Sequence, residues 1–186
     1  TNASDAEAIF RREVELGRTL VQVGFMREYD QAHQDLKAAL ADVGSPLLFR
    51  GFHYNPSKGV ERHIDDVITN TAIHDIHSAH WLVGEEIVEV YTRHIPHAVD
   101  RQETCRLLVL HLTFRSGALG VVQVNSDSGY GYEVAVEITG ASGQITTSPA
   151  ARPLVRNRGG LTQAIDTHSL DRFGEAYVRE AQSWVA

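Results

Sequence analysis

The apolar and polar positions of residues 67–84 repeat with the period of an amphipathic helix. Side chains three, four and seven positions apart share a face, because an α-helix has about 3.6 residues per turn. One face would carry Asn70, His74, His77 and Trp81. The opposite face would carry Ala72, Ile76, Ala79 and Val83. The pattern predicts a helix that packs on a core with its apolar face and presents its polar face for binding or chemistry.

Three further helices are predicted from caps and apolar stripes. A capping box at Ser4 begins a helix that ends at Gly17, and Asp30 caps a helix that runs to about residue 42. The last helix covers residues 169–185, with an apolar stripe of Phe173, Tyr177, Ala181 and Trp184. Between the first two helices, residues 19–25 are rich in β-favouring side chains and predict a short strand.

The remaining β-rich runs predict a large sheet. They cover residues 47–53, 86–94, 104–115, 118–125, 132–139 and 144–147. Short turns separate most of them, so successive hairpins and a mainly antiparallel sheet are expected. Residues 54–66 are expected to be a loop, and residues 149–165 an irregular segment. Helices would cover one sheet face, which is expected to carry Val109, Leu110, Leu112 and Phe114. The other face would stay open to solvent or to another subunit, and the whole predicts an α+β fold.

Composition narrows the classes of partner. The 186 residues are 42% hydrophobic and 22% charged, as in an ordinary globular domain, and the net charge of −7 argues against nucleic acid and anionic membranes. Small molecules or proteins are therefore the expected partners. The single cysteine, Cys105, excludes an internal disulfide and fits a reducing cytoplasm. No apolar run approaches the roughly 20 residues of a membrane span.

Five short motifs, in order along the chain, resemble one enzyme family. They are VGFMREYD at 23–30, HYNP at 53–56, ITNTAIHDIHSAHWL at 68–82, YGYE at 130–133 and FGEAYVREAQSWV at 173–185. Together they resemble the substrate domain of the glucose-fructose oxidoreductase/inositol dehydrogenase family, and most of all its inositol 2-dehydrogenase branch. Each motif alone is weak, but their common order over most of the chain makes the match specific.

The resemblance implies a division of labour between two domains. Members of the family carry an N-terminal dinucleotide-binding Rossmann domain and a Glu-Lys-Pro segment with a catalytic lysine, and neither occurs in this sequence. Residues 1–20 would then be a helix and linker leading from that domain, and residues 21–186 the substrate-binding and oligomerisation domain, without the family's last helix and strand. NAD or NADP would be bound mainly by the other domain, and this chain alone would be inactive. A polyol or sugar would be the substrate, and a homodimer or homotetramer would form through the open sheet face.

The resemblance also implies catalytic residues. His74 matches the family's catalytic histidine, and Asn70 stands where an aspartate is usual. An imidazole near neutrality suits the removal of a hydroxyl proton while hydride leaves carbon. Asn70 can orient the ring or the substrate by hydrogen bonds but cannot stabilise an imidazolium by charge. Without the resemblance, His74 would be interpreted as an ordinary surface or core histidine.

Five more positions match residues that approach the polyol in this family. They are Arg27, His53, Asn55, Tyr130 and Tyr132. A ligand with many hydroxyl groups needs several fixed donors and acceptors, because an unpaired buried hydroxyl is costly. Each residue also has a structural alternative: Arg27 in an ion pair, Asn55 in a turn, and the tyrosines in sheet packing.

Two other classes of function stay open. A metal site would use His74, His77 and His80, with His63, Asp65, Asp66 and Asp75 nearby, although His80 points about 100° or more away from His74 on a regular helix. A non-catalytic binding or assembly module would use the open sheet face instead.

Overall fold

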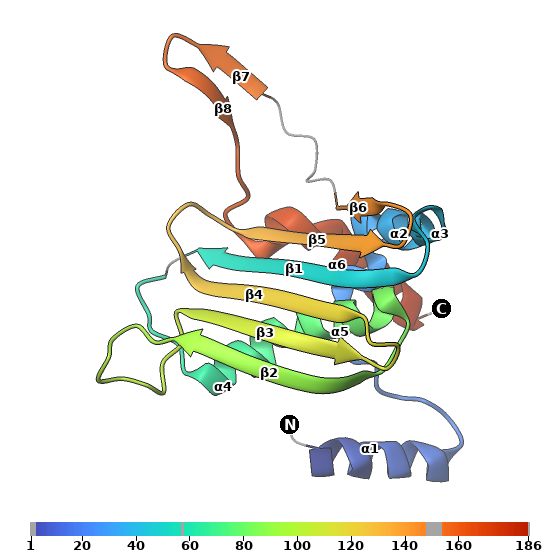
Figure 1. Cartoon of the computed structure of the whole chain (residues 1–186). Helices are drawn as coiled ribbons and strands as arrows, with labels where there is room; N and C mark the ends of the chain where they lie inside the picture. Colours follow the sequence, from blue (N-terminus) through green and yellow to red (C-terminus); the bar gives the residue numbers. More distant parts are fainter. Residues whose placement is uncertain (1–2, 57, 148–153, 186) are drawn as a thin grey trace.

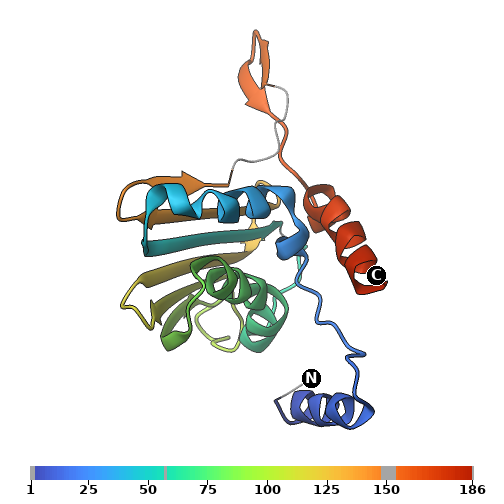
Figure 2. The same ribbon diagram turned by 90° about the vertical axis from the view of Figure 1, so that its right-hand side faces the viewer.

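A computed structural model describes residues 3–56, 58–147 and 154–185. In it, a six-stranded sheet is covered on one face by helices (Figure 1, Figure 2). The strands are β1 (Pro46–Pro56), β2 (Ile87–Ile95), β3 (Leu107–Phe114), β4 (Leu119–Ser128), β5 (Glu133–Gly140) and β6 (Gln144–Thr146). The α+β fold with a mainly antiparallel sheet, predicted from the sequence, is confirmed.

The strand order is β2-β3-β4-β1-β5-β6, so β1 lies between two strands that come much later in the chain. It runs parallel to β4 and antiparallel to β5, and the other neighbours are antiparallel hairpins. The expectation of hairpins throughout was wrong for β4 and β5, which are separated by β1. Residue His53 on β1 thereby pairs with Val124 on one side and Val134 on the other.

The helices are α1 (Ala3–Leu16), α2 (Gln31–Ala38), α3 (Leu40–Val43), α4 (Ile64–Val67), α5 (Ile73–Val83) and α6 (Ser169–Val185). A short 3-10 helix η1 (Met26–Tyr29) precedes α2, and a π-helix η2 (Ile68–Ala72) joins α4 to α5. As predicted, Asp30 caps α2, accepting a hydrogen bond from the His33 backbone. Helix α1 already includes Ser4, so its predicted capping role was wrong. Gly84 ends α5 in a left-handed conformation that favours glycine.

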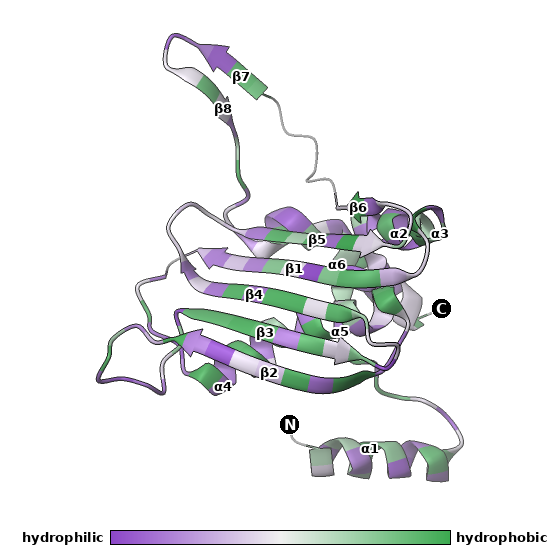
Figure 3. Ribbon diagram, viewed as in Figure 1, coloured by the Kyte–Doolittle hydropathy of each residue, from purple (hydrophilic) through white to green (hydrophobic). Residues whose placement is uncertain are grey.

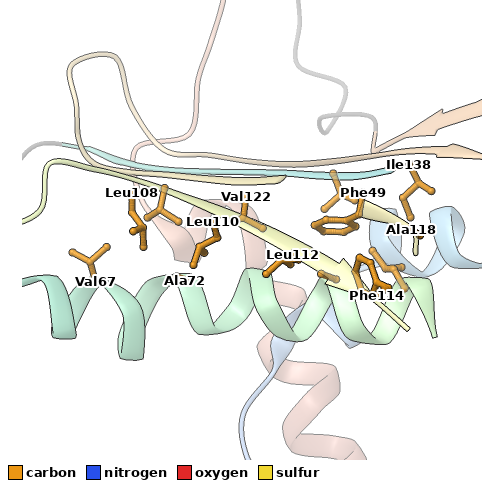
Figure 4. Close-up of a cluster of buried hydrophobic side chains, with 14 of the residues drawn as sticks. Phe49, Val67, Ala72, Leu108, Leu110, Leu112, Phe114, Ala118, Val122 and Ile138 are labelled. Carbon is orange, nitrogen blue, oxygen red and sulfur yellow. The ribbon is translucent and has the colours of Figure 1, made fainter. Parts of the chain in front are cut away.

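The core lies between the sheet and the helices α4, η2 and α5. Alternate β3 side chains are buried there, namely Leu108, Leu110, Leu112 and Phe114. Figure 4 shows Leu108 and Leu110 over Val67 and Ala72, with Leu112 and Phe114 further along the same helical segment. Val109 was wrongly assigned to this face, since alternation along a strand turns it to the other side, where it is half-buried.

Among the described residues, no helix covers the opposite sheet face (Figure 2). Its side chains mix apolar and polar types, and include Phe52, Tyr54, His111, Val121 and Gln123. Figure 3 shows the mixture of hydropathies along these strands. The face is therefore neither fully apolar, as a core is, nor fully charged. Such a mixed composition is typical of many protein interfaces.

Two segments differ from their predictions. Residues 19–25 form no strand, because they lie beside no strand that could pair with them, and Leu20 and Val21 donate backbone hydrogen bonds to Glu13 instead. Within the predicted irregular stretch, the described residues form a separate two-stranded ribbon of β7 (Leu154–Asn157) and β8 (Gly160–Gln163), which projects from the body in Figure 1. Residues 149–153 of that stretch lie outside the described residues.

Across residues 3–56, 58–147 and 154–185, no helix is long and apolar enough to cross a membrane.

Candidate functional site

The helix that organises the site is not the regular α-helix expected from the pattern. Its π-helical turn uses hydrogen bonds from residue i to residue i+5 and so displaces Asn70 relative to α5. The buried side of the segment carries Thr71, Ala72, Asp75, Ser78, Ala79 and Leu82. Asp75, three residues after Ala72 and four before Ala79, thus points into the molecule and is 1% exposed.

Asp75 joins two residues that the sequence had nominated, Arg27 of η1 and His53 of β1. Arg27 Nη1 donates to Asp75 Oδ1 at 2.7 Å, and His53 Nδ1 lies 2.8 Å from Asp75 Oδ2. Arg27 Nη2 is 3.0 Å from the same His53 nitrogen, and Ser78 Oγ lies 3.4 Å from Arg27 Nη1. All four side chains are buried. Three elements distant in sequence therefore meet at one buried ion pair.

Tyr132, just before β5, extends this network. Its hydroxyl lies 3.5 Å from His53 Nε2, and the two rings meet edge to face. On its other side Tyr132 packs with Met26 and with Phe173 of α6. Tyr132 therefore connects the buried ion pair to helix α6.

The charges of the network follow from its contacts. Burial alone would raise the pKa of Asp75, but Arg27 and then His53 outweigh burial and hold that pKa well below its ordinary value. Burial lowers the pKa of His53, and the attraction of Asp75 does not compensate for it. At neutral pH the network thus contains a cationic Arg27, an anionic Asp75 and a neutral His53.

His74 follows the other side of the helix and is half-buried. Burial, and secondarily the positive charge of Arg27, lowers its pKa to about 4, so the imidazole is neutral and able to accept a proton at pH 7. Its Nδ1 is buried without a hydrogen-bond partner in the part of the chain that the structure describes. The ring meets Phe25 edge-on, and Phe25 in turn stacks on His77 at 3.7 Å between centroids.

The other nominated residues lie further from this network. Asn70 is exposed and donates its side-chain hydrogen bond to Asp66, and Asn55 is half-buried at the end of β1. Tyr130 is 50% exposed, bonds to Glu133, and packs on Tyr54. Tyr130 and Tyr132 both line a cavity of about 220 Å³.

The sequence analysis missed the part that Asp75 plays, naming it only among possible metal ligands. A signal was present, since an acidic residue at helical spacing from Ala72 and Ala79 lies on the apolar face and needs a buried partner. It also missed Glu28, whose carboxylate lies 3.1 Å from His77 Nε2.

A second buried cluster fixes the last helix to the site. Arg172 at the start of α6 makes a two-pronged contact with Asp30, at 2.6 and 2.9 Å. Asp30 also lies 2.6 Å from Nδ1 of the fully buried His33. This cluster sets the position of Phe173, which packs against Tyr132.

The histidines considered as metal ligands contact other groups of the chain instead. His77 is paired with Glu28, and His63 accepts a backbone hydrogen bond from Asp65. Among the residues with described positions, no group of three or more His, Cys, Asp or Glu is arranged to hold a metal ion.

The buried histidines make stability depend on pH. In the folded chain the pKa values of His33 and His53 are lowered, chiefly by burial, while unfolded histidines titrate near about 6.5. Below about pH 6.5 the two histidines bind protons in the unfolded state but not in the folded state, so the free energy of unfolding falls as the pH falls. Their stabilising effect is complete above about pH 6.5 and is lost as the pH drops toward the folded-state values.

Urea denaturation between about pH 7.5 and 5 checks this prediction. Each of the two histidines makes the free energy of unfolding fall by at most about 1.4 kcal/mol per pH unit. Because His33→Gln removes one titrating ring, its free energy of unfolding should depend less steeply on pH. A free energy of unfolding that stays constant or rises on acidification over this range would contradict the assignment of neutral buried histidines.

Residues 33–146 match the model of the GFO/IDH/MocA C-terminal domain. The inositol 2-dehydrogenase of Rubrobacter xylanophilus is 43% identical over 99% of this chain and 54% of its own length. Inositol 2-dehydrogenase 2 of Saccharopolyspora erythraea is 36% identical over 98% of this chain and 56% of its own length.

Solved structures agree. The myo-inositol dehydrogenase from Lactobacillus casei, in complex with NAD(H) and myo-inositol, is 29% identical with a TM-score of 0.88, over 96% of this chain and 54% of that one. The chain spans about half the length of the relatives it matches. These matches confirm the resemblance that the five motifs indicated: the chain belongs to the GFO/IDH/MocA family and is similar to its C-terminal domain.

Proposed function

We propose that the chain is the substrate-binding half of an NAD(P)-dependent oxidoreductase that acts on a CH–OH group of a polyol or sugar, as an inositol dehydrogenase does. The observation that carries the proposal is His74, a neutral imidazole beside a buried ion network, in a chain related to inositol 2-dehydrogenases. A secondary alcohol loses a hydroxyl proton when it is oxidised. His74 would take that proton.

The surrounding residues would bind and orient the substrate. Arg27 is occupied by Asp75 and lies 3.0 Å from His53 Nδ1, so in this proposal it holds the site together more than it contacts ligand. His53 Nε2, the Tyr132 hydroxyl and the side chains of Asn55 and Tyr130 would supply the fixed donors and acceptors that a polyol requires. Asn70, bound to Asp66, would have to exchange that partner to reach the substrate.

The glycine-rich turn of residues 140–143 does not fit the phosphates of a dinucleotide. Phosphate-binding turns of this type join a strand to the N-terminus of a helix, whereas the glycines of residues 140–143 belong to the turn between β5 and β6. We therefore assign NAD or NADP to a Rossmann domain in a longer protein, with residues 1–20 as the connection. Without that domain the chain would be inactive. The buried free thiol of Cys105 supports a reducing cytoplasm as its location.

The test is reduction of NAD or NADP by the longer protein, measured with myo-inositol and a panel of other polyols and sugars. The proposal expects reduction with at least one of them and with one cofactor preferred. It expects none from residues 1–186 alone. Absence of polyol-dependent reduction with either cofactor would contradict the proposal.

A second candidate, assembly without catalysis, is favoured by the open sheet face. We propose a homodimer or homotetramer through this face, since Phe52, Val121 and their neighbours form an uncovered, partly apolar surface. Light scattering of residues 1–186 at several concentrations should show an oligomer that Val121→Glu dissociates. Phe10→Glu, on the exposed face of α1, is the matched control and should leave it intact. A wild-type chain that is monomeric at all concentrations would refute the contact.

A further inference from the structure

We propose that Asp75 is a positioning residue that fixes the tautomer of His53, so that the imidazole hydrogen is on Nδ1 and Nε2 is a hydrogen-bond acceptor toward Tyr132. The placement of the hydrogen follows from the contacts of His53 and from its burial. Its consequence for substrate binding rests on the proposed function.

The argument begins with the two neighbours of His53 Nδ1. Asp75 Oδ2 lies 2.8 Å away and Arg27 Nη2 lies 3.0 Å away. A guanidinium only donates and an ionised carboxylate only accepts, whereas a neutral imidazole nitrogen does one or the other. Nδ1 can therefore satisfy one of these neighbours and not both.

The carboxylate prevails. Arg27 already donates to Asp75 Oδ1 at 2.7 Å and lies 3.4 Å from Ser78 Oγ, so its charge is balanced without His53. Within the described chain, His53 is the hydrogen-bond partner of Asp75 Oδ2. If Nδ1 carried no hydrogen, a buried anionic oxygen would face a nitrogen lone pair at 2.8 Å, which costs more than an unused arginine hydrogen. The shorter of the two contacts, the one with the carboxylate, is the hydrogen bond.

The choice at Nδ1 determines the other end of the ring. With its hydrogen on Nδ1, His53 presents a lone pair at Nε2, 3.5 Å from the Tyr132 hydroxyl. Tyr132 is then the donor in that contact, and its oxygen keeps lone pairs for a further partner. Burial raises the pKa of Tyr132, so the phenol keeps its hydrogen. The series from Asp75 through His53 to Tyr132 would therefore accept a hydrogen bond from a substrate hydroxyl.

Substitution of Asp75 by asparagine should reverse the tautomer. Asparagine has one acceptor oxygen and one donor nitrogen where aspartate has two acceptors. Arg27 Nη1 requires the oxygen, so the amide NH₂ faces His53 Nδ1, which must then accept. The hydrogen moves to Nε2, and the acceptor toward Tyr132 is lost.

Nitrogen-15 NMR of the histidine rings in residues 1–186 measures both states, because protonated and bare ring nitrogens have well-separated chemical shifts. His53→Gln assigns the signals. The wild type should show His53 with its hydrogen on Nδ1, and Asp75→Asn with its hydrogen on Nε2. Asp30→Asn changes the corresponding aspartate beside His33 and is the matched control. It should leave His53 unchanged.

Three results would overturn the proposal. They are a wild-type His53 with its hydrogen on Nε2, a doubly protonated wild-type ring, and an Asp75→Asn ring that keeps its hydrogen on Nδ1. If Asp75→Asn does not fold, the wild type and Tyr132→Phe decide. Tyr132→Phe should keep the hydrogen on Nδ1, and its movement to Nε2 would show that Tyr132 fixes the ring instead. These readouts need no catalysis, so they stand or fall separately from the proposed reaction.

Discussion

Replacing His74 by alanine in the longer dehydrogenase proposed above should lower the turnover of its polyol or sugar by about two to four orders of magnitude, the usual contribution of a general acid or base. The reason is chemical, since an alkyl side chain cannot take the hydroxyl proton. His74 is neutral at pH 7 because burial and Arg27 lower its pKa to about 4. The loss should fall mainly on kcat rather than on KM, because proton transfer belongs to the transition state.

Steady-state kinetics of NAD(P) reduction measure this effect. His80→Ala is the matched control, because His80 is an exposed histidine of the same helix, α5, and lies outside the sheet face proposed for assembly. It should leave turnover unchanged. If His74→Ala retained the turnover of the wild type, His74 would not be the base. The family membership and the fold would be unaffected by that outcome.

Replacing Arg27 by methionine should destabilise the chain by about 3–5 kcal/mol, as expected when one partner of a buried ion pair is removed. Arg27 and Asp75 are each 1% exposed. Methionine fills similar space but leaves the Asp75 carboxylate without its counter-charge. Urea denaturation at neutral pH measures the change in the free energy of unfolding.

The matched control is Arg11→Met. Arg11 also contacts a carboxylate, Glu7 at 3.2 Å, but both side chains are more than two-thirds exposed, at 76% and 68%. Water screens such a pair, so its loss should change the free energy of unfolding by about 0.5 kcal/mol or less. Equal effects of the two variants would show that burial does not make the Arg27–Asp75 pair important.

Local patterns predicted the elements more accurately than their arrangement. The cap at Asp30 and the stop at Gly17 are short-range chemistry, and the structure confirms both. The order of strands in the sheet could not be predicted in this way, because β-propensity indicates that a segment is a strand but not which strand it pairs with. Residues 19–25 have strand propensity but no neighbour to pair with, and they are not a strand.

The site was predictable to the extent that the motifs carried it. Arg27, His53 and Tyr132 were nominated by resemblance and are brought together, although periodicity alone gave no reason to join them. The regular-helix assumption placed Asn70 beside His74, and the π-helical turn was not visible in the sequence. Helical spacing marked Asp75 as buried, but only the fold identified Arg27 and His53 as its partners.

The position of β1 between β4 and β5 has a consequence for synthesis on the ribosome. Leu48 of β1 pairs with Leu119 of β4 and Thr139 of β5. Both neighbours of this early strand are therefore translated much later than the strand itself. Contacts so distant in sequence close slowly. His53 emerges long before Tyr132, and the nascent chain therefore completes its site only when β5 has left the exit tunnel. Until then, β1 is an unpaired edge of the kind that chaperones protect.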